Sequence, residues 1–164
     1  MLKFIQASRR QHESFSSVQI DGVSWRNRKI PLSHGRHVTG RYSPGPGREG
    51  VPFESHTEYK VIAHLSALPG VRVILSQPFT IDYRAHGTRR RYTPDLLVVA
   101  DPLPRELARN GFGALTVLEV KAVVDPYSRA LIEFKVQLST HATGLPALIA
   151  VPTSKNVGEV DHAH

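Results

Sequence analysis

Apolar residues recur at helical spacing in the stretch that begins at Ser55. Val61, Ile62 and Leu65 lie on one side of a helix with 3.6 residues per turn, which predicts a helix over about 55–68. Ser55 and the glutamate three residues after it form the S-x-x-E pattern of a capping box, and Pro69 followed by glycine ends the pattern. Both ends of this helix are therefore marked in the sequence.

Further apolar runs alternate with turn residues after this helix. The predicted elements are strands at 71–84, 89–100 and 115–124, a helix at 126–142 and a strand at 147–152. The first two strands are expected to pair with each other, and Pro78 marks a break or an edge in the first. Leu131, Phe134 and Leu138 carry the pattern of the second helix, and Gly144 follows its end.

The order of these elements is α-β-β-β-α-β, which predicts an α/β or α+β fold with a mixed sheet and helices packed against it. Residues 51–152 form this core, and residues 153–164 form a polar, flexible tail. Residues 1–50 are rich in glycine, proline and basic residues and predict a partly irregular arm. Within it, VQIDGVSW at 18–25 predicts a short strand or a hairpin that turns at Asp21-Gly22.

Positive charge is concentrated in this arm. Residues 1–50 contain nine Lys and Arg against three acids, so they carry +6 of the formal net charge of +7. A basic arm predicts an anionic partner, and nucleic acid is the commonest such partner. A solubilising tail is the alternative that charge alone leaves open.

The composition excludes several kinds of protein. The chain has no cysteine, which rules out disulfides and thiolate metal sites and is typical of the cytoplasm. The N-terminal residues lack the apolar core of a signal peptide, and no apolar run approaches the length of a membrane span. We therefore expect a cytoplasmic protein without membrane contact.

Charged residues interrupt the apolar strands in a specific arrangement. Glu119 and Lys121 lie two residues apart and so share one face of the third strand, and Asp95 follows Pro94 at the entry to the second. Glu58 lies three, four and seven residues before the apolar helix positions, which places it on the core side of that helix. We therefore expect Glu58, Asp95, Glu119 and Lys121 to converge.

Three carboxylates and one lysine leave negative charge uncompensated, and a divalent cation balances it. Oxygen ligands without cysteine favour Mg²⁺, with Mn²⁺ as a substitute, over zinc. Such an ion orients water and stabilises the charge that develops when a phosphodiester is attacked. The lysine would hold the attacking water, help to deprotonate it or pair with the phosphate.

Each of these residues also has a structural interpretation. Glu58 is suited to be only the N3 acid of the capping box, and the two interpretations of it are about equally supported. Asp95 is a common turn residue after proline, and Glu119 and Lys121 fit a solvated strand face. It is the combination, in this element order and beside a basic segment, that favours a site.

The same residues resemble a known pattern. TPD at 93–95 followed by EVK at 119–121 is similar to the PD-(D/E)XK nuclease superfamily. More narrowly, residues 36–152 resemble the catalytic domain of TnsA-type transposon endonucleases, through FES at the helix entry, the QPF-x-I strand, RRRYTPD and LEVK. The ordered set of motifs is much more specific than PD or E-x-K alone.

The resemblance implies a restriction-endonuclease-like core and a metal-dependent DNA endonuclease. It implies that Asp95, Glu119 and the backbone carbonyl of Val120 bind the metal, that Lys121 is the catalytic lysine, and that Glu58 completes the site. It also implies cleavage at the ends of a transposon, leaving 5′-phosphate and 3′-hydroxyl ends, together with a DDE-type transposase and a targeting ATPase. Family members carry a C-terminal domain for partner contacts, for which the segment after Pro152 is too short.

Arginines lead into this site. Arg89, Arg90 and Arg91 immediately precede the TPD motif, and we expect them to hold DNA phosphates while the metal acts on one of them. Further basic residues of the arm extend the predicted DNA track: Arg26, Arg28, Lys29, Arg36, Arg41 and Arg48. A solvated hairpin and a flexible arm are the structural alternative.

Other polar residues give weaker signals. His34 and His37 form an H-x-x-H pattern without a second pair of ligands, so we predict no zinc site there. Lys135 and Gln137 on the second helix are equally compatible with the site and with the surface. Two further functions stay open: a stand-alone structure-specific nuclease or junction resolvase of the same superfamily, and a catalytically silent DNA-binding or assembly protein.

Overall fold

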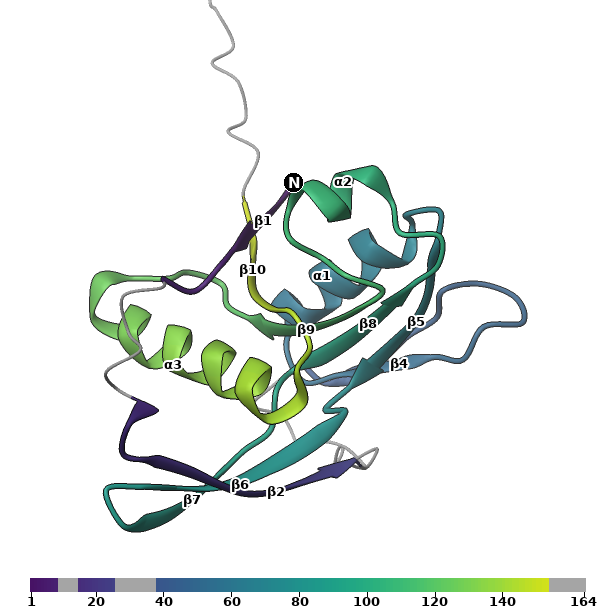
Figure 1. Ribbon diagram of the computed structural model, residues 1–164. Coiled ribbons are helices and arrows are strands. Elements are labelled where there is room, and N and C mark those ends of the chain that lie inside the picture. The colour runs from purple at the N-terminus through teal and green to yellow at the C-terminus, as the bar shows by residue number, and fades with distance from the viewer. Residues whose placement is uncertain (9–14, 26–37, 154–164) are drawn as a thin grey trace, which may run out of the picture.

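The computed structural model describes residues 1–8, 15–25 and 38–153 (Figure 1). Its strands are β1 (Leu2–Ile5), β2 (Val18–Trp25), β3 (Gly40–Tyr42), β4 (Val51–Phe53), β5 (Val71–Ser76), β6 (Phe79–Ala85), β7 (Thr88–Tyr92), β8 (Leu96–Ala100), β9 (Leu115–Val120) and β10 (Ala147–Pro152). Its helices are α1 (His56–Ser66), α2 (Arg105–Arg109) and α3 (Pro126–Thr143). None of these helices is long and apolar enough to cross a membrane.

Five strands form a mixed central sheet in the order β1-β10-β9-β8-β5 (Figure 1). β10 and β9 run parallel, and the other neighbours run antiparallel. Side chains of β9 alternate between the two faces: Leu118 and Val120 pack with α1, and Val117 packs toward α3. The expected combination of a mixed sheet with helices packed against it is therefore confirmed.

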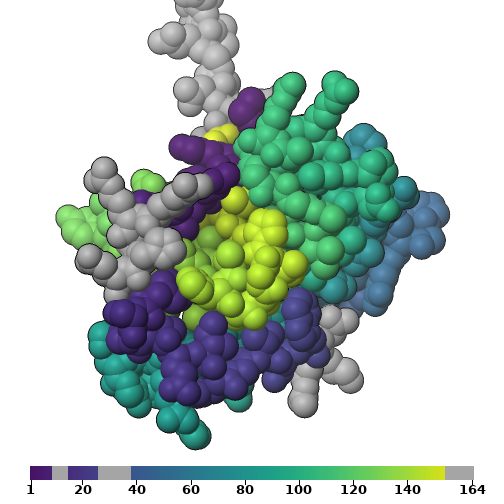
Figure 2. Space-filling model, viewed as in Figure 1, coloured from purple at the N-terminus to yellow at the C-terminus, as the bar shows by residue number. Residues whose placement is uncertain are grey.

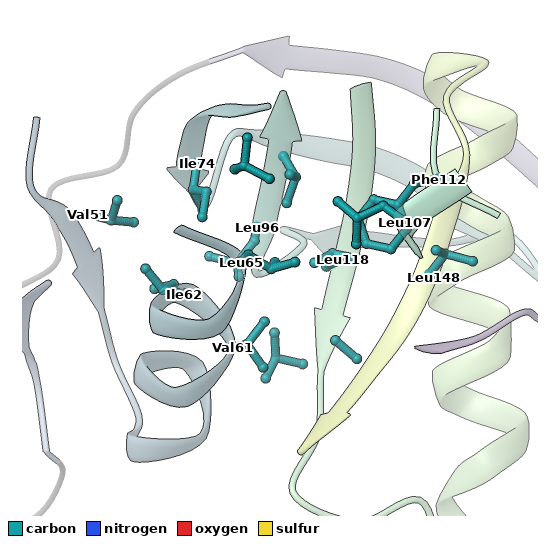
Figure 3. Close-up of a cluster of buried hydrophobic side chains, with 14 of the residues drawn as sticks. Val51, Val61, Ile62, Leu65, Ile74, Leu96, Leu107, Phe112, Leu118 and Leu148 are labelled. Atoms are coloured by element: carbon teal, nitrogen blue, oxygen red, sulfur yellow. The ribbon is translucent and has the colours of Figure 1, made fainter. Parts of the chain in front are cut away.

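The larger core lies between α1 and the sheet. Val61, Ile62 and Leu65 of α1 are fully buried and point toward Leu96 and Leu118 (Figure 3). Burying each such side chain contributes about 1.5–3 kcal/mol, so this face of α1 fixes the helix on the sheet. The helix begins where the sequence predicts.

The two strands predicted at 71–84 and 89–100 form one long hairpin that is shared between two sheets. Its outer half, β6 and β7, leaves the central sheet, whereas its inner half, β5 and β8, stays in it. The predicted break at Pro78 is confirmed, and a second break at Pro94 lies opposite it. The backbone N–H of Gln77 donates to the carbonyl of Asp95 at 2.8 Å, which joins the two breaks.

The second sheet has the order β2-β6-β7 and packs its apolar face against α3 and the central sheet. In Figure 2 the purple surface of β2 lies directly below the yellow surface of α3 and β10. The predicted strand at 18–25 is confirmed, but the hairpin interpretation is wrong. The chain passes Asp21-Gly22 as a bulge within one continuous strand, because β6 pairs with both halves of β2.

Residues 1–50 contribute β1, β2 and β3 to the fold, in addition to the irregular parts predicted there. β1 pairs with β10 at one edge of the central sheet, and β3 pairs with β4 in a two-stranded sheet. Residues 9–14, 26–37 and 154–164 lie outside the described residues. The predicted tail falls almost entirely within the last of these.

The helix α3 begins and ends at the residues that the sequence marks. Asp125 accepts hydrogen bonds from the N–H groups of Tyr127 and Ser128, and Gly144 follows the helix with φ 73°. The predicted buried face is partly wrong: Leu131 is 60% exposed, and the neighbouring Ile132 is buried instead. The third strand is also shorter than predicted and ends at Val120.

Candidate functional site

Asp95 and the end of β9 meet because β8 and β9 are antiparallel. Leu96, the first residue of β8, pairs with Leu118, two residues before the last residue of β9. The Asp95 carboxylate therefore reaches past the end of the ladder, where its Oδ2 accepts a hydrogen bond from the N–H of Val120 at 2.7 Å. One predicted site residue is thus fixed to the strand that carries the others.

Lys121 joins the two acidic residues. Its Nζ lies 2.8 Å from Oε1 of Glu119 and 3.9 Å from Oδ2 of Asp95. Its backbone N–H donates to the carbonyl of Ala150, so the lysine is still held by the sheet although the strand has ended. The expected convergence of Asp95, Glu119 and Lys121 is present in the structure.

Glu119 is 3% exposed and is held by two further side chains besides Lys121. The hydroxyl of Tyr92, the last residue of β7, donates to its Oε2 at 2.5 Å. Lys135 of α3 places its Nζ 3.6 Å from Oε1 and 5.4 Å from the centre of the Tyr92 ring. A carboxylate in this position is stable only with such partners, because an unpaired buried charge is costly.

Sequence reasoning missed Tyr92 and left Lys135 undecided. Tyr92 stands three residues before Asp95 and directly after three arginines, and a tyrosine in a predicted strand is ordinarily interpreted as a packing residue. Lys135 lies on the helix that follows the E-x-K motif, one turn after the exposed Leu131. Only one signal in the sequence could have indicated these two partners of Glu119. It is a polar side chain on each element that packs against the strand carrying Glu119.

Glu58 has the structural role expected of a capping residue. Its N–H donates to Ser55 Oγ at 3.0 Å, and its carboxylate accepts from the Ser55 hydroxyl and from the N–H of Glu54. Its charge nevertheless acts on the other site residues, raising the pKa of both Asp95 and Lys121. The capping box and the proximity to the site are therefore compatible.

Burial dominates the electrostatics of the cluster. It raises the pKa of Asp95 to about 7, and the nearby Glu119 adds to the rise, although Lys121 and the Val120 N–H oppose it. The pKa of Tyr92 rises well above 10 because the side chain is buried beside Glu119. Burial alone would lower the pKa of Lys121, but Glu119 and Asp95 outweigh it and the pKa rises.

The donors of this cluster bear on metal binding. Within residues 1–8, 15–25 and 38–153, no three His, Asp or Glu side chains form a metal-holding group by themselves. In a strand the N–H and C=O of one residue point to the same side, so the Val120 carbonyl faces the side of Asp95. Two carboxylates and this carbonyl suit Mg²⁺, which commonly binds one or two carboxylates and keeps several waters.

The predicted DNA-binding arginines differ in their surroundings. Arg89, Arg90 and Arg91 are exposed on β7, where Arg91 pairs with Asp82 at 2.8 Å. Arg41 donates to the carbonyl of Gly50, and the half-buried Arg48 donates to two backbone carbonyls. The last two thus have structural contacts, and the remaining basic residues of the predicted track, together with His34 and His37, lie outside the described residues.

Comparisons with known proteins give no relative for this arrangement. The chain matches no family model, no curated protein and no solved structure. The function must therefore be argued from the geometry of the site.

Proposed function

We propose that this protein is a Mg²⁺-dependent DNA endonuclease with a restriction-endonuclease-like core, similar to the TnsA-type transposon endonucleases. The observation that carries the proposal is the convergence of Asp95, Glu119 and Lys121 at the breaks of the long hairpin. Asp95 comes from a different part of the chain than Glu119 and Lys121, and the Glu119 carboxylate is buried. The motifs TPD and EVK support the same assignment.

In this proposal Asp95, Glu119 and the Val120 carbonyl hold the metal ion. Bound there, Mg²⁺ would polarise the scissile phosphodiester and orient the attacking water. The Lys121 ammonium lies between the carboxylates of Asp95 and Glu119, where its positive charge balances their negative charge. The residues present therefore fit a divalent cation.

The other side chains of the site have distinct roles in this proposal. Lys121, whose side chain is 31% exposed, reaches solvent and would pair with the phosphate or with the attacking water. Tyr92 and Lys135 keep the Glu119 carboxylate in one orientation. Glu58 is held by its cap at the start of α1 and adds negative charge to the site.

DNA is the proposed substrate because positive charge lies on the element that leads to the site. Arg89, Arg90 and Arg91 are exposed along β7, directly before Tyr92 and Asp95. Contacts of arginine with the phosphate backbone position DNA and carry little sequence information. Choice of the cleavage position is therefore assigned to a partner, proposed to be a DDE-type transposase with its targeting ATPase.

Nicking of supercoiled plasmid tests this proposal. Wild type is assayed with Mg²⁺, with Mn²⁺ and with EDTA, beside Asp95→Asn, Glu119→Gln and Lys121→Ala. Exposed residues outside the site supply matched controls, Glu106→Gln for the carboxylates and Lys60→Ala for the lysine. Metal-dependent nicking that survives in both controls and disappears in the three site variants is the expected result, and equal nicking by all six proteins refutes it.

A catalytically silent DNA-binding protein is the second candidate. It is favoured by the saturation of Glu119, whose two carboxylate oxygens already have donors in Tyr92, Lys121 and Lys135. Such a protein binds DNA in EDTA, without any divalent cation, and nicks neither plasmid nor branched DNA in Mg²⁺. Metal binding separates the two candidates directly: Mn²⁺ titration should give heat with wild type and none with Asp95→Asn if the first is right.

A further inference from the structure

A hollow of about 790 Å³ opens beside β5, on the opposite side of that strand from β8. Five consecutive residues of β5, 72–76, form one wall, and the β3–β4 hairpin with its connecting loop forms the other. Within the described part of the chain β5 pairs only with β8, so it is an edge strand of the central sheet. The main-chain groups of an edge strand are a template for pairing with another extended segment.

The hollow is positively charged. Arg41, Arg48 and Arg72 line it, against one carboxylate, that of Glu49. Each arginine donates to backbone carbonyls; Arg72, for example, donates to the carbonyl of Asp101 at 2.6 Å. Among the described residues none of the three arginines has a carboxylate within 4.0 Å, and the acceptors of their hydrogen bonds are neutral carbonyls.

Two buried hydroxyl groups of residues that line the hollow lack hydrogen-bond partners in the described structure. They are Oγ of Ser66 and Oγ of Ser76, and Ser76 is only 7% exposed. Buried polar groups are nearly always hydrogen-bonded, since leaving them unpaired costs free energy. The hollow therefore combines an edge strand that β4 contacts over part of its length, an excess of positive charge, and two serines whose buried hydroxyls are unpaired.

We infer that this groove binds an extended acidic segment of a partner protein, which adds to β5 as a further strand. Main-chain hydrogen bonds to the edge would supply affinity, and carboxylates opposite Arg41 and Arg72 would supply selectivity. A second copy of the chain fits poorly, because pairing of the same edges brings arginine against arginine. A nucleic-acid strand would match the charge but would leave the β5 main chain without partners.

The inference goes beyond the proposed nuclease activity and does not depend on it. It is tested with the full chain and a fluorescent peptide of about eight residues that alternates glutamate and valine, a length typical of a strand. The matched probes are the lysine–valine peptide, a glutamate–valine peptide interrupted by prolines, and an oligothymidylate of equal length. Binding is measured by anisotropy at low salt for wild type, Arg72→Glu, Arg41→Glu and the control Arg109→Glu, an exposed residue of α2.

The acidic peptide should bind wild type and Arg109→Glu equally and each groove variant at least about tenfold more weakly. The proline-interrupted peptide should bind at least about tenfold more weakly than the uninterrupted one, because proline removes main-chain donors. Hydrogen exchange should slow at those amides of residues 72–76 that point away from β8 when the acidic peptide is bound.

Four results would overturn the inference: no peptide binding, equal binding of the lysine peptide, an equal loss in Arg109→Glu, or tighter binding of the oligothymidylate that the groove variants lose. The last would make the groove a nucleic-acid site. Because none of these measurements uses nicking activity, their failure is distinguishable from failure of the proposed nuclease function.

Discussion

Two glutamates of this protein are equally buried but held in different ways. Glu119 and Glu133 are each 3% exposed. Glu133 pairs at 2.8 Å with Arg129, one turn earlier in the same helix. Glu119 instead draws its partners from β7, from the residue beyond β9 and from α3.

This difference separates a local pair from an assembled one. The Arg129–Glu133 pair requires only that α3 be helical, so it stabilises the helix and nothing beyond it. The Glu119 cluster requires both sheets and α3 to be in place, and it lies beside a second carboxylate. Convergence of distant charged residues at a desolvated position is characteristic of functional sites, whereas an i,i+4 pair is ordinary.

The largest expected contrast is in catalysis. In the proposed nuclease, Glu119→Gln should reduce plasmid nicking by a factor on the order of 100 or more, because it removes a fixed charge from the site. Glu133→Gln should nick at the wild-type rate, because Glu133 pairs within α3. Initial nicking rates are measured for both variants in saturating Mg²⁺. Equal losses of activity in the two would show that Glu119 has no special role in catalysis compared with Glu133.

Stability gives the next contrast. Tyr92→Phe removes a buried hydrogen bond to a carboxylate and should cost about 1.5–3 kcal/mol in the free energy of unfolding. Tyr83→Phe is the control, since Tyr83 belongs to the same apolar cluster. Urea denaturation at pH 7 compares them, and a Tyr92→Phe protein as stable as the wild type would show that the Glu119 cluster is not held by this bond.

The pH dependence of stability tests whether the pKa of Asp95 is raised in the folded protein. Its pKa is raised from 3.8 to about 7 in the folded protein. The folded state therefore binds the proton more tightly than the unfolded chain does. This contribution is fully present below about pH 4 and is lost as the pH rises through 7.

Asp95→Asn cannot ionise, so its melting temperature relative to wild type should rise between pH 5 and pH 8. A change of about 3 °C corresponds to roughly 1 kcal/mol in a domain of this size. Melting is followed by circular dichroism in EDTA, which keeps divalent cations away from the carboxylates. A difference that stays constant with pH would mean that the Asp95 pKa is close to its ordinary value.

The smallest effect is expected for the local pair. Replacing both partners together, in Arg129→Gln/Glu133→Gln, leaves no unpaired buried charge and should lower the free energy of unfolding by only about 0.5 kcal/mol, the usual value for an i,i+4 pair. The same urea titration measures it. A loss as large as that expected for Tyr92→Phe would mean that the two buried glutamates are held equally strongly.

The parts of the fold that sequence predicts well are those decided locally. Ser55 and Glu58 lie within one helical turn, and the structure has the cap that their spacing predicts. Pro78 breaks a strand because it lacks a backbone donor, and Gly144 ends α3 because it adopts a positive φ at little cost. Such signals involve neighbouring residues and hold wherever the segment packs.

The parts that sequence predicts poorly depend on distant partners. β1 is a four-residue strand whose only ladder is with β10, near the other end of the described chain. The face of α3 that is buried is set by β9, β10 and the second sheet, which is why Ile132 rather than Leu131 lies inside. Neither the partner nor the face is encoded in the segment itself.

The candidate site divides along the same line. Asp95, Glu119 and Lys121 could be grouped in advance because strand alternation and the entry proline place them. Tyr92 and Lys135 could not, because their approach to Glu119 depends on where β7 leaves the central sheet and on how α3 crosses β9. Glu58 had two interpretations, and the structure gives grounds for both.

The long hairpin with paired breaks has a mechanical consequence. Tyr92 ends the outer half of this hairpin, and Asp95 stands at the entry to its inner half. Arg89, Arg90 and Arg91 lie on the outer half of this hairpin. A force on that half is transmitted to both carboxylates, since Tyr92 is hydrogen-bonded to Glu119, and Asp95, three residues later, is hydrogen-bonded to Val120. A ligand that bends the β6–β7 half of the hairpin would therefore change the distance between the carboxylates of Asp95 and Glu119.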